Sequence, residues 1–468
     1  MAFWNRRKPI DDEEPIDEDQ RLAATLSWPH LVALGVGAII GTGIFVLIGT
    51  GVNLAGPGVL LSFAIVGVVC ACAAFCYAEV STMIPAAGSA YTYSYTVLGE
   101  LLAWIIGWSL ILEYSLVVTA VAIGWSGYAS NFAAGWGIPA ELLAGPMAGG
   151  VVNLPAIFII FVVAGLLMLG TRESATVNML LVLVKLAALG LFIWVTWPHF
   201  DAERFQPFMP YGFGGPLQET GVMAAAAIIF FAFYGFDAIS TAAEETRNPG
   251  RDLPIGIVGS MVLCTAIYMA VAAVAVGAVP FQTFANSPEA LAVILRGVDE
   301  PDAAKLIAGA AVVAFPTVLL AFLYGQSRIF FVMARDGLLP KALSKVSPRT
   351  KTPLVMTLVT AVLLAGLAGF LPIDKAAALA NAGTLAAFIA VAVCMLVLRA
   401  RDPGRPRVFK APLGWPVGLI AIGGCLYLFA SLPRDTQLLF VVWNGVGLLA
   451  YLAYGMHQSK LARRARAS

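Results

Sequence analysis

Charged residues are scarce in this sequence. Only 12% of its 468 residues are charged, whereas 60% are hydrophobic. A soluble globular domain carries about 25% charged residues. This composition excludes a soluble enzyme or binding module. The hydrophobic residues are gathered in runs of about 20 or more, which predict membrane-spanning helices and not the short alternating strands of a barrel.

Side chains that carry metal or catalytic chemistry are few as well. The three histidines, His30, His199 and His457, are far apart, and the chain has no HExxH, Walker or GxSxG motif. All six cysteines lie inside apolar runs, where they are expected to be small core residues. The sequence therefore predicts no enzyme and no ATP-driven pump, and we expect no metal, no cofactor and no nucleic-acid partner.

Twelve apolar segments divide the chain into a polar tail (1–27), a transmembrane domain (28–455) and a basic tail (456–468). Between the second and third segments, Pro85–Glu100 contains no Lys or Arg and carries three tyrosines, which we interpret as an amphipathic helix along the inner face. The twelve segments are predicted at 29–52, 57–83, 101–131, 151–170, 176–198, 218–244, 253–278, 304–333, 353–371, 376–399, 415–432 and 436–455.

The basic residues are distributed unevenly between the two sides of these segments. Of 28 Lys and Arg residues, 22 lie on the side of the two termini, five lie on the other side, and Lys185 lies inside the fifth segment. Basic residues concentrate in cytoplasmic loops. We therefore expect both termini in the cytoplasm and the chain in a bacterial inner (plasma) membrane.

The first segment contains the glycine-rich stretch GVGAIIGTGIFVLIG (Gly35–Gly49). Glycine frees φ, and broken backbone at membrane depth is tolerated where it lines a cavity or contacts protein. We expect the helix to unwind at Gly41–Gly43, so that the freed amides of the outer half-helix face a cavity and suit a carboxylate. Close helix packing through small residues is the alternative that this stretch leaves open.

A second interruption is predicted five segments later. The centre of segment 218–244, Phe230 to Asp237, is aromatic and contains Gly235 and one acid. Two interrupted segments at corresponding places indicate an inverted repeat of five helices, with the binding site between the two breaks near the midplane. The repeats then cover about 29–198 and 218–399, and two extra helices cover about 415–455.

Lys185, Glu113 and Asp237 lie deep within apolar segments, where a charge at the bilayer centre costs roughly 2.5–3.5 kcal/mol. Lys185 has apolar neighbours and no acid near it in sequence. Because the pKa of lysine falls readily on burial, Lys185 is a candidate for proton coupling; an ion pair with Glu113 or Asp237 is the alternative. Glu113 is compatible with a structural or a functional role, and Asp237 suits the start of an inner half-helix.

Three further acids lie near the predicted cytoplasmic ends of segments. Glu79 is expected to form a salt bridge with a loop arginine. Glu244 and Glu245, which precede Arg247 and Arg251, are expected to make gate or loop contacts and not to bind a ligand.

Four stretches of the sequence carry a specific signal together. They are GAIIGTGIF (Gly37–Phe45), PAAGSAYTYSY (Pro85–Tyr95), FFAFYGFDAISTAAEETRNPGRDLP (Phe230–Pro254) and YGQSRIFFVMARDGLLP (Tyr324–Pro340). They resemble the amino acid–polyamine–organocation superfamily, and most closely its cationic-amino-acid-transporter branch with the related bacterial amino acid permeases. The resemblance covers nearly all of residues 20–455. It implies an all-α fold of the leucine-transporter type: twelve transmembrane helices in two inverted repeats of five plus two extra helices, with helices 1 and 6 broken at the midplane.

The resemblance also implies a substrate site. Amides of the first break would bind the carboxylate of an amino acid, and carbonyls beside both breaks would bind its ammonium. Phe231 resembles the aromatic gate over the site, and Lys185 matches the lysine that replaces sodium in proton-coupled members. Ala321 in the eighth segment would leave space for a side chain. The implied amides are those of Gly41, Thr42 and Gly43, and the implied carbonyls are those of Ile39, Phe231, Ala232 and Tyr234.

These observations predict a secondary transporter that imports L-amino acids by alternating access, coupled to protons. An amino acid or polyamine exchanger without net proton coupling and a non-transporting amino acid sensor are the alternatives. Side-chain specificity stays open, since no acid dedicated to a cationic side chain is evident beyond Asp237 and Glu113. Membrane lipid surrounds such a chain, and a small single-helix subunit or a bound sterol or lipid would leave no readable mark in the sequence.

Overall fold

The computed structural model describes residues 6–9, 22–133, 137, 139–215, 218–285, 287, 289–348, 350, 352–371 and 373–467. Most of the predicted polar tail, residues 1–5 and 10–21, lies outside this range. The described residues are predominantly helical, and their only β-type pairing is an isolated bridge between Leu26 and Thr246. The chain is therefore all-α over the described ranges.

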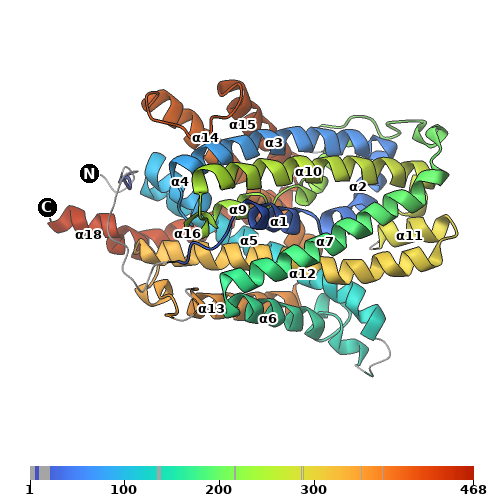
Figure 1. The fold of residues 1–468 in the computed structure, drawn as a ribbon, viewed down its shortest axis with the longest axis horizontal. Helices are drawn as coiled ribbons and strands as arrows, with labels where there is room; N and C mark the ends of the chain where they lie inside the picture. The colour runs from blue at the N-terminus through green and yellow to red at the C-terminus, as the bar shows by residue number, and fades with distance from the viewer. Residues whose placement is uncertain are drawn as a thin grey trace.

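Long helices run roughly parallel to one another, with the interrupted helix α1 near the centre, both termini at one end and α11 at the other (Figure 1). The α-helices are α1 (Trp28–Ile39), α2 (Ile48–Ala55), α3 (Val59–Met83), α4 (Ser89–Val97), α5 (Glu100–Ala133), α6 (Leu154–Leu169), α7 (Thr171–Thr196), α8 (Val222–Ile229), α9 (Asp237–Ser240), α10 (Pro249–Ala278), α11 (Ala290–Gly297), α12 (Pro301–Arg335), α13 (Leu354–Phe370), α14 (Ile373–Arg401), α15 (Trp415–Ala430), α16 (Arg434–Ala450), α17 (Met456–Gln458) and α18 (Lys460–Ala467).

Eight helical stretches among the described residues are long and apolar enough to cross a membrane. One of them, Trp28–Met83, contains the first two predicted segments together. Three shorter apolar helices, α6, α13 and α15, overlap the fourth, ninth and eleventh predicted segments. Every predicted apolar segment thus overlaps an apolar helical stretch, and the chain is a multi-pass membrane protein.

Helix α4 differs from the predicted amphipathic surface helix. All nine of its residues, Ser89–Val97, are buried inside the protein. The Tyr91 hydroxyl donates to Asp336 at 3.0 Å, and the Tyr95 hydroxyl donates to Glu100 at 3.0 Å. The prediction was wrong because the tyrosines indicated a headgroup interface, whereas the buried carboxylates of Glu100 and Asp336 accept the hydroxyls of Tyr95 and Tyr91.

Helix α12 carries a proline in its interior, and the fold compensates for it. Pro316 has no N–H and so cannot donate to the carbonyl of Val312 four residues earlier. The indole Nε1 of Trp125 on α5 donates to that carbonyl at 2.8 Å. This contact joins α5 to α12 five residues before Thr317, which takes part in the site described next.

Candidate functional site

The first interruption lies at the end of α1. The helix stops at Ile39, and Ile40 is extended with φ −78° and ψ 107°. The last carbonyls of a helix have no partner within it. Here side chains supply the donors: the Lys185 ammonium donates to the carbonyls of Gly37 (2.9 Å) and Ile40, and the Tyr268 hydroxyl donates to that of Ile39 at 2.6 Å. The predicted interruption at Gly41–Gly43 is therefore present and begins one residue earlier.

The chain resumes its helical path immediately beyond this break. A π-helical turn covers Gly43–Leu47 and leads into α2. The amides of Gly41, Thr42 and Gly43 donate to no described residue, as expected for the first N–H groups of a helix. Free amides at the positive end of a helix dipole can bind an anion such as a carboxylate.

The second interruption follows α8. A 3-10 turn covers Phe230–Ala232, and Gly235 has a φ of +120°, which a residue with a side chain rarely adopts. No described amide outside this turn donates to the carbonyls of Phe231, Ala232 or Tyr234. The second break thus offers acceptors where the first offers donors.

Two glycines allow the breaks to touch. A Cβ added at Gly43 would lie 2.4 Å from the Cα of Ala232, and one added at Gly235 would lie 2.8 Å from the Cβ of Ala38. Any side chain at these positions would push the breaks apart. The glycines therefore set the distance between the free amides and the free carbonyls.

A small cavity of about 10 Å³ lies between the two breaks, closed by valines of α5 and by Val318 and Phe322 of α12. This volume is close to that of a single water probe. The hydroxyls of Thr42 and Tyr234 are buried here without a hydrogen-bond partner among the described residues. The lining residues are Ala38, Ile39, Gly41, Thr42, Gly43, Val117, Val121, Phe231, Tyr234, Val318 and Phe322.

Six of the eight predicted substrate-binding residues line this cavity: Ile39, Gly41, Thr42, Gly43, Phe231 and Tyr234. Ala232 and Ala321 do not. Ala232 lies behind the lining against Gly43, and Ala321 is fully buried on α12 beside Phe322. The face of α12 toward the cavity carries Val318 and Phe322, four residues apart on one side of the helix.

Lys185 is fully buried, and all its donors are used on uncharged groups. Its ammonium donates to the two α1 carbonyls and to the hydroxyl of Thr317, which in turn donates to the Gly37 carbonyl at 2.9 Å. No ion pair links it to Glu113 or Asp237, so the structural ion pair left open by the sequence is absent. A cation at the C-terminal end of α1 is favoured by the helix dipole.

The two acids of this region are Asp237, which begins α9 directly after the second break, and Glu113 on α5. Asp237 accepts from the Tyr114 hydroxyl at 2.6 Å and from the Gly235 amide at 3.0 Å. It therefore fixes the bend before α9. Both carboxylate oxygens of Glu113 are buried without a partner among the described residues.

The sequence did not reveal which residues of other helices contact the first break. Thr317 and Tyr268 bind α1 carbonyls, and four apolar residues from α5 and α12 close the cavity. Thr317 directly follows Pro316 in the middle of α12, and a hydroxyl at such a position could have indicated a functional residue. Nothing local to Tyr268 indicated its partner, 229 residues away in the chain.

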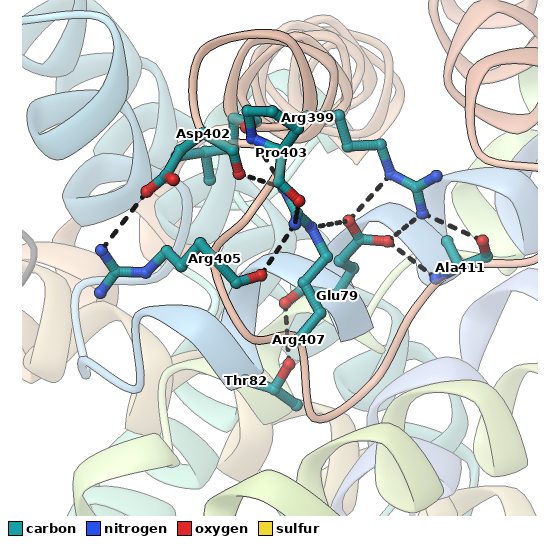
Figure 2. A network of polar contacts seen from close by, with 9 residues as sticks. Glu79, Thr82, Arg399, Asp402, Pro403, Arg405, Arg407 and Ala411 are labelled. Carbon is teal, nitrogen blue, oxygen red and sulfur yellow. Dashed lines mark hydrogen bonds and ion pairs between the residues drawn. The ribbon is translucent and has the colours of Figure 1, made fainter.

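Acid–arginine pairs gather near the end of the molecule that holds the termini. Glu79 on α3 accepts from Arg399, from Arg407 at 3.2 Å and from the Ala411 amide at 2.7 Å, as Figure 2 shows. The predicted salt bridge between Glu79 and a loop arginine is confirmed, since Arg407 lies in the segment after α14.

Glu244 and Glu245 pair with α12 and not with the neighbouring Arg247 and Arg251. Glu245 binds the buried Arg328 at 2.9 Å. Glu244 binds both terminal nitrogens of Arg335, at 2.6 and 2.8 Å. Burial alone would raise the pKa of the Glu244 carboxyl, but the Arg335 guanidinium and the Ala87 amide outweigh it and lower this pKa.

Comparison with known proteins adds to this geometry. Residues 26–452 match the family described as "Amino acid permease". The chain is 47% identical over 465 residues to the "Branched-chain amino acid permease BcaP" of Bacillus subtilis, covering 97% of this chain and 98% of that protein. It is 43% identical over 466 residues to the "Methylthioribose transporter" of the same organism, covering 98% and 100%.

A third relative comes from a plant. The chain is 41% identical over 405 residues to the "Cationic amino acid transporter 2, vacuolar" of Arabidopsis thaliana. The match covers 85% of this chain and 63% of that protein.

Proposed function

The chain belongs to the amino acid permease family of the amino acid–polyamine–organocation superfamily, and from this membership we propose that it imports L-amino acids by proton-coupled alternating access. It is a membrane transporter and not an enzyme. The observation that carries the coupling proposal is Lys185, a buried amine bound to uncharged oxygens only.

The proposed topology has twelve crossings, two inverted repeats of five helices and two extra helices, in a bacterial plasma membrane. The overlap of every predicted segment with an apolar helical stretch supports the crossings. The positive-inside bias and the position of both termini at one end in Figure 1 support cytoplasmic termini. The paired interruptions after α1 and α8 support the repeat.

In the proposed binding mode, the substrate bridges the two breaks. Its carboxylate accepts from the amides of Gly41, Thr42 and Gly43, and its ammonium donates to carbonyls of the second break. The Ile39 carbonyl already accepts from Tyr268, so it contributes one remaining lone pair. Because the cavity of about 10 Å³ is too small for an amino acid, Val318, Phe322 or Phe231 must move when the substrate enters.

The proposed coupling acts through the bonds of Lys185. Protonated Lys185 ties the end of α1 on one side to Thr317 of α12 on the other. Loss of the proton toward the cytoplasm removes one of the three donations and weakens the other two, because a neutral amine has only two hydrogens and no charge. The looser tie favours the inward-facing arrangement. Protons are thus the coupling ion, and no cofactor is required.

We propose that the transported side chain is apolar and branched. Its surroundings are Val117, Val121, Val318 and Phe322, and no acid lines the cavity. A cationic side chain would lose its hydration without a counter-charge. The name of the Bacillus subtilis relative at 47% identity, which refers to branched-chain amino acids, agrees with this chemistry.

A proteoliposome uptake assay tests the proposal. Labelled leucine, isoleucine, valine, alanine, arginine and methylthioribose are offered with and without an inward proton gradient. We expect gradient-driven accumulation of the branched amino acids. Exchange without accumulation would indicate an exchanger, and saturable binding without flux would indicate a sensor. Accumulation of methylthioribose in place of amino acids would assign the chain the activity named for the 43% identical relative.

A further inference from the structure

A second, larger cavity lies at the end of the molecule opposite the termini. Its volume is about 340 Å³, and it is enclosed by α5, α11 and the start of α12. Figure 1 shows α11 at this end, away from both chain termini. Cavities of roughly 300 Å³ and more are typical of small-molecule sites. The proposed topology places this cavity on the outer side of the membrane.

Charges of both signs line this outer cavity. Arg296 and Lys305 supply positive charge, and Glu289 supplies negative charge. Arg296 pairs with Glu289 at 3.3 Å, with the two side chains 52% and 23% exposed. An exposed pair of this kind contributes only about 0–1 kcal/mol. A ligand carrying both charges can therefore replace it at little cost.

The remaining wall is apolar and leads toward the central site. Ala304 and Ala308 lie four residues apart on one face of α12, and Tyr128 is almost fully buried beneath them. The Tyr128 ring meets Phe315 edge-on at 5.4 Å between centroids, and Phe315 meets Phe45 edge-on at 6.1 Å.

Phe45 belongs to the π-helical turn that begins at Gly43, which lines the central cavity. Three packed rings thus lie between the outer cavity and the first break. Tyr128 borders the outer cavity, and the last ring of the series, Phe45, lies two residues beyond Gly43 of the central cavity.

We propose that the outer cavity is a second binding site for a zwitterionic amino acid, filled before the ring barrier opens. This proposal rests on the proposed function. The α-carboxylate binds Arg296, with Lys305 beside it, the α-ammonium binds Glu289, and an aliphatic side chain lies against Ala304 and Ala308. Such a site is weaker than the central one, because its charged side chains stay partly hydrated.

Protection of an introduced thiol tests this site directly. Ala308→Cys places a thiol on the cavity wall, and all six natural cysteines are buried, so background labelling is low. The Gly43→Ala substitution weakens the central site in the same chain, because its Cβ collides with Ala232. We expect leucine to slow labelling by a membrane-impermeant thiol reagent even in this background.

Charge variants then identify the binding groups. Arg296→Gln and Glu289→Gln each remove one charged partner, and we expect about tenfold more leucine to be needed for protection. Arg434→Gln, an arginine outside the cavity, is the matched control and should leave the concentration unchanged.

Absence of protection by leucine in the Gly43→Ala background, or protection that is unaffected by both charge variants, would overturn the second site. Failure of the second site can be distinguished from failure of the proposed function, because uptake by the chain with Gly43 intact reports on transport alone. Protection without any uptake in that chain would support the outer site and reject transport.

Discussion

Two buried basic residues in this protein have opposite surroundings. Lys185, near the first helix break, contacts carbonyls and a hydroxyl, and no carboxylate. Arg328, toward the end with the termini, binds the Glu245 carboxylate at 2.9 Å and lies over the Tyr324 ring at 3.8 Å from its centroid. Both side chains are at most 1% exposed.

The difference separates a group that can change its charge from one that cannot. A lysine without a counter-charge loses its proton more easily when it is buried, whereas an arginine stays protonated in proteins. In the proposed mechanism, Lys185 is therefore the charge that a proton gradient switches. The acid–arginine pairs at the terminal end keep their charges, so the proposed helix movement would have to separate them.

Removing the switchable charge should have the largest effect. Lys185→Met eliminates three hydrogen bonds from a charged donor, each worth about 1.5–3 kcal/mol, so we expect uptake driven by a proton gradient to fall roughly a hundredfold or more. Lys185→Arg retains the charge but cannot release the proton, and it should lose accumulation too. Proteoliposome uptake across pH values measures both. Unchanged pH dependence in Lys185→Met would reject the coupling mechanism.

Breaking the permanent pair should cost stability instead of coupling. Glu245→Gln leaves the Arg328 charge buried without its partner, and we expect about 3–5 kcal/mol of destabilisation. The double variant Glu245→Leu with Arg328→Met removes both charges and should recover most of that loss. Denaturation of the detergent-solubilised protein gives the comparison. Equal losses in the single and double variants would show that the buried charge is not the cause.

The contact between the two breaks can be tested at Gly43. Gly43→Ala introduces a Cβ 2.4 Å from the Ala232 Cα, and overpacking of this kind costs about 1–3 kcal/mol. We expect leucine affinity at the central site to drop roughly tenfold to a hundredfold. Gly165→Ala on α6 is the control, since its added Cβ meets no atom within 4 Å. Normal leucine uptake by Gly43→Ala would argue against a site formed by the two breaks.

The smallest effect concerns Glu244. Its lowered pKa means that the carboxylate contributes stability above the ordinary pKa of glutamate, and that this contribution disappears as the pH falls through the lower, folded-state pKa. Glu244→Gln should therefore destabilise the protein by about 1 kcal/mol at pH 7. This gap, the difference in unfolding free energy between the variant and the unaltered protein, should narrow in acid. Thermal unfolding at several pH values measures the gap. A gap that widens in acid would contradict this sign.

Local sequence was sufficient to predict features whose cause is local. Gly41–Gly43 and Gly235 identified the two interruptions because glycine tolerates backbone conformations, such as the φ of +120° at Gly235, that other residues rarely adopt. Lys185 was identified as a buried base because nothing around it in sequence is polar. Glu79 was correctly assigned to a salt bridge because an acid near a predicted helix end needs a cation.

Contacts between segments that are far apart in the sequence determined the features that local sequence did not predict. The donors to the α1 carbonyls come from α7, α10 and α12. The tyrosines of α4 donate to the first residue of α5 and to the residue after α12. Which face of α12 borders the cavity followed from packing, so Val318 and Phe322 line it and Ala321 does not. The sequence by itself determined a multi-pass helical membrane protein, the two glycine breaks and a lone buried lysine. Only the tertiary structure decided the partners of that lysine and the second cavity, because hydrogen bonds and cavity walls form between residues that chain order leaves far apart.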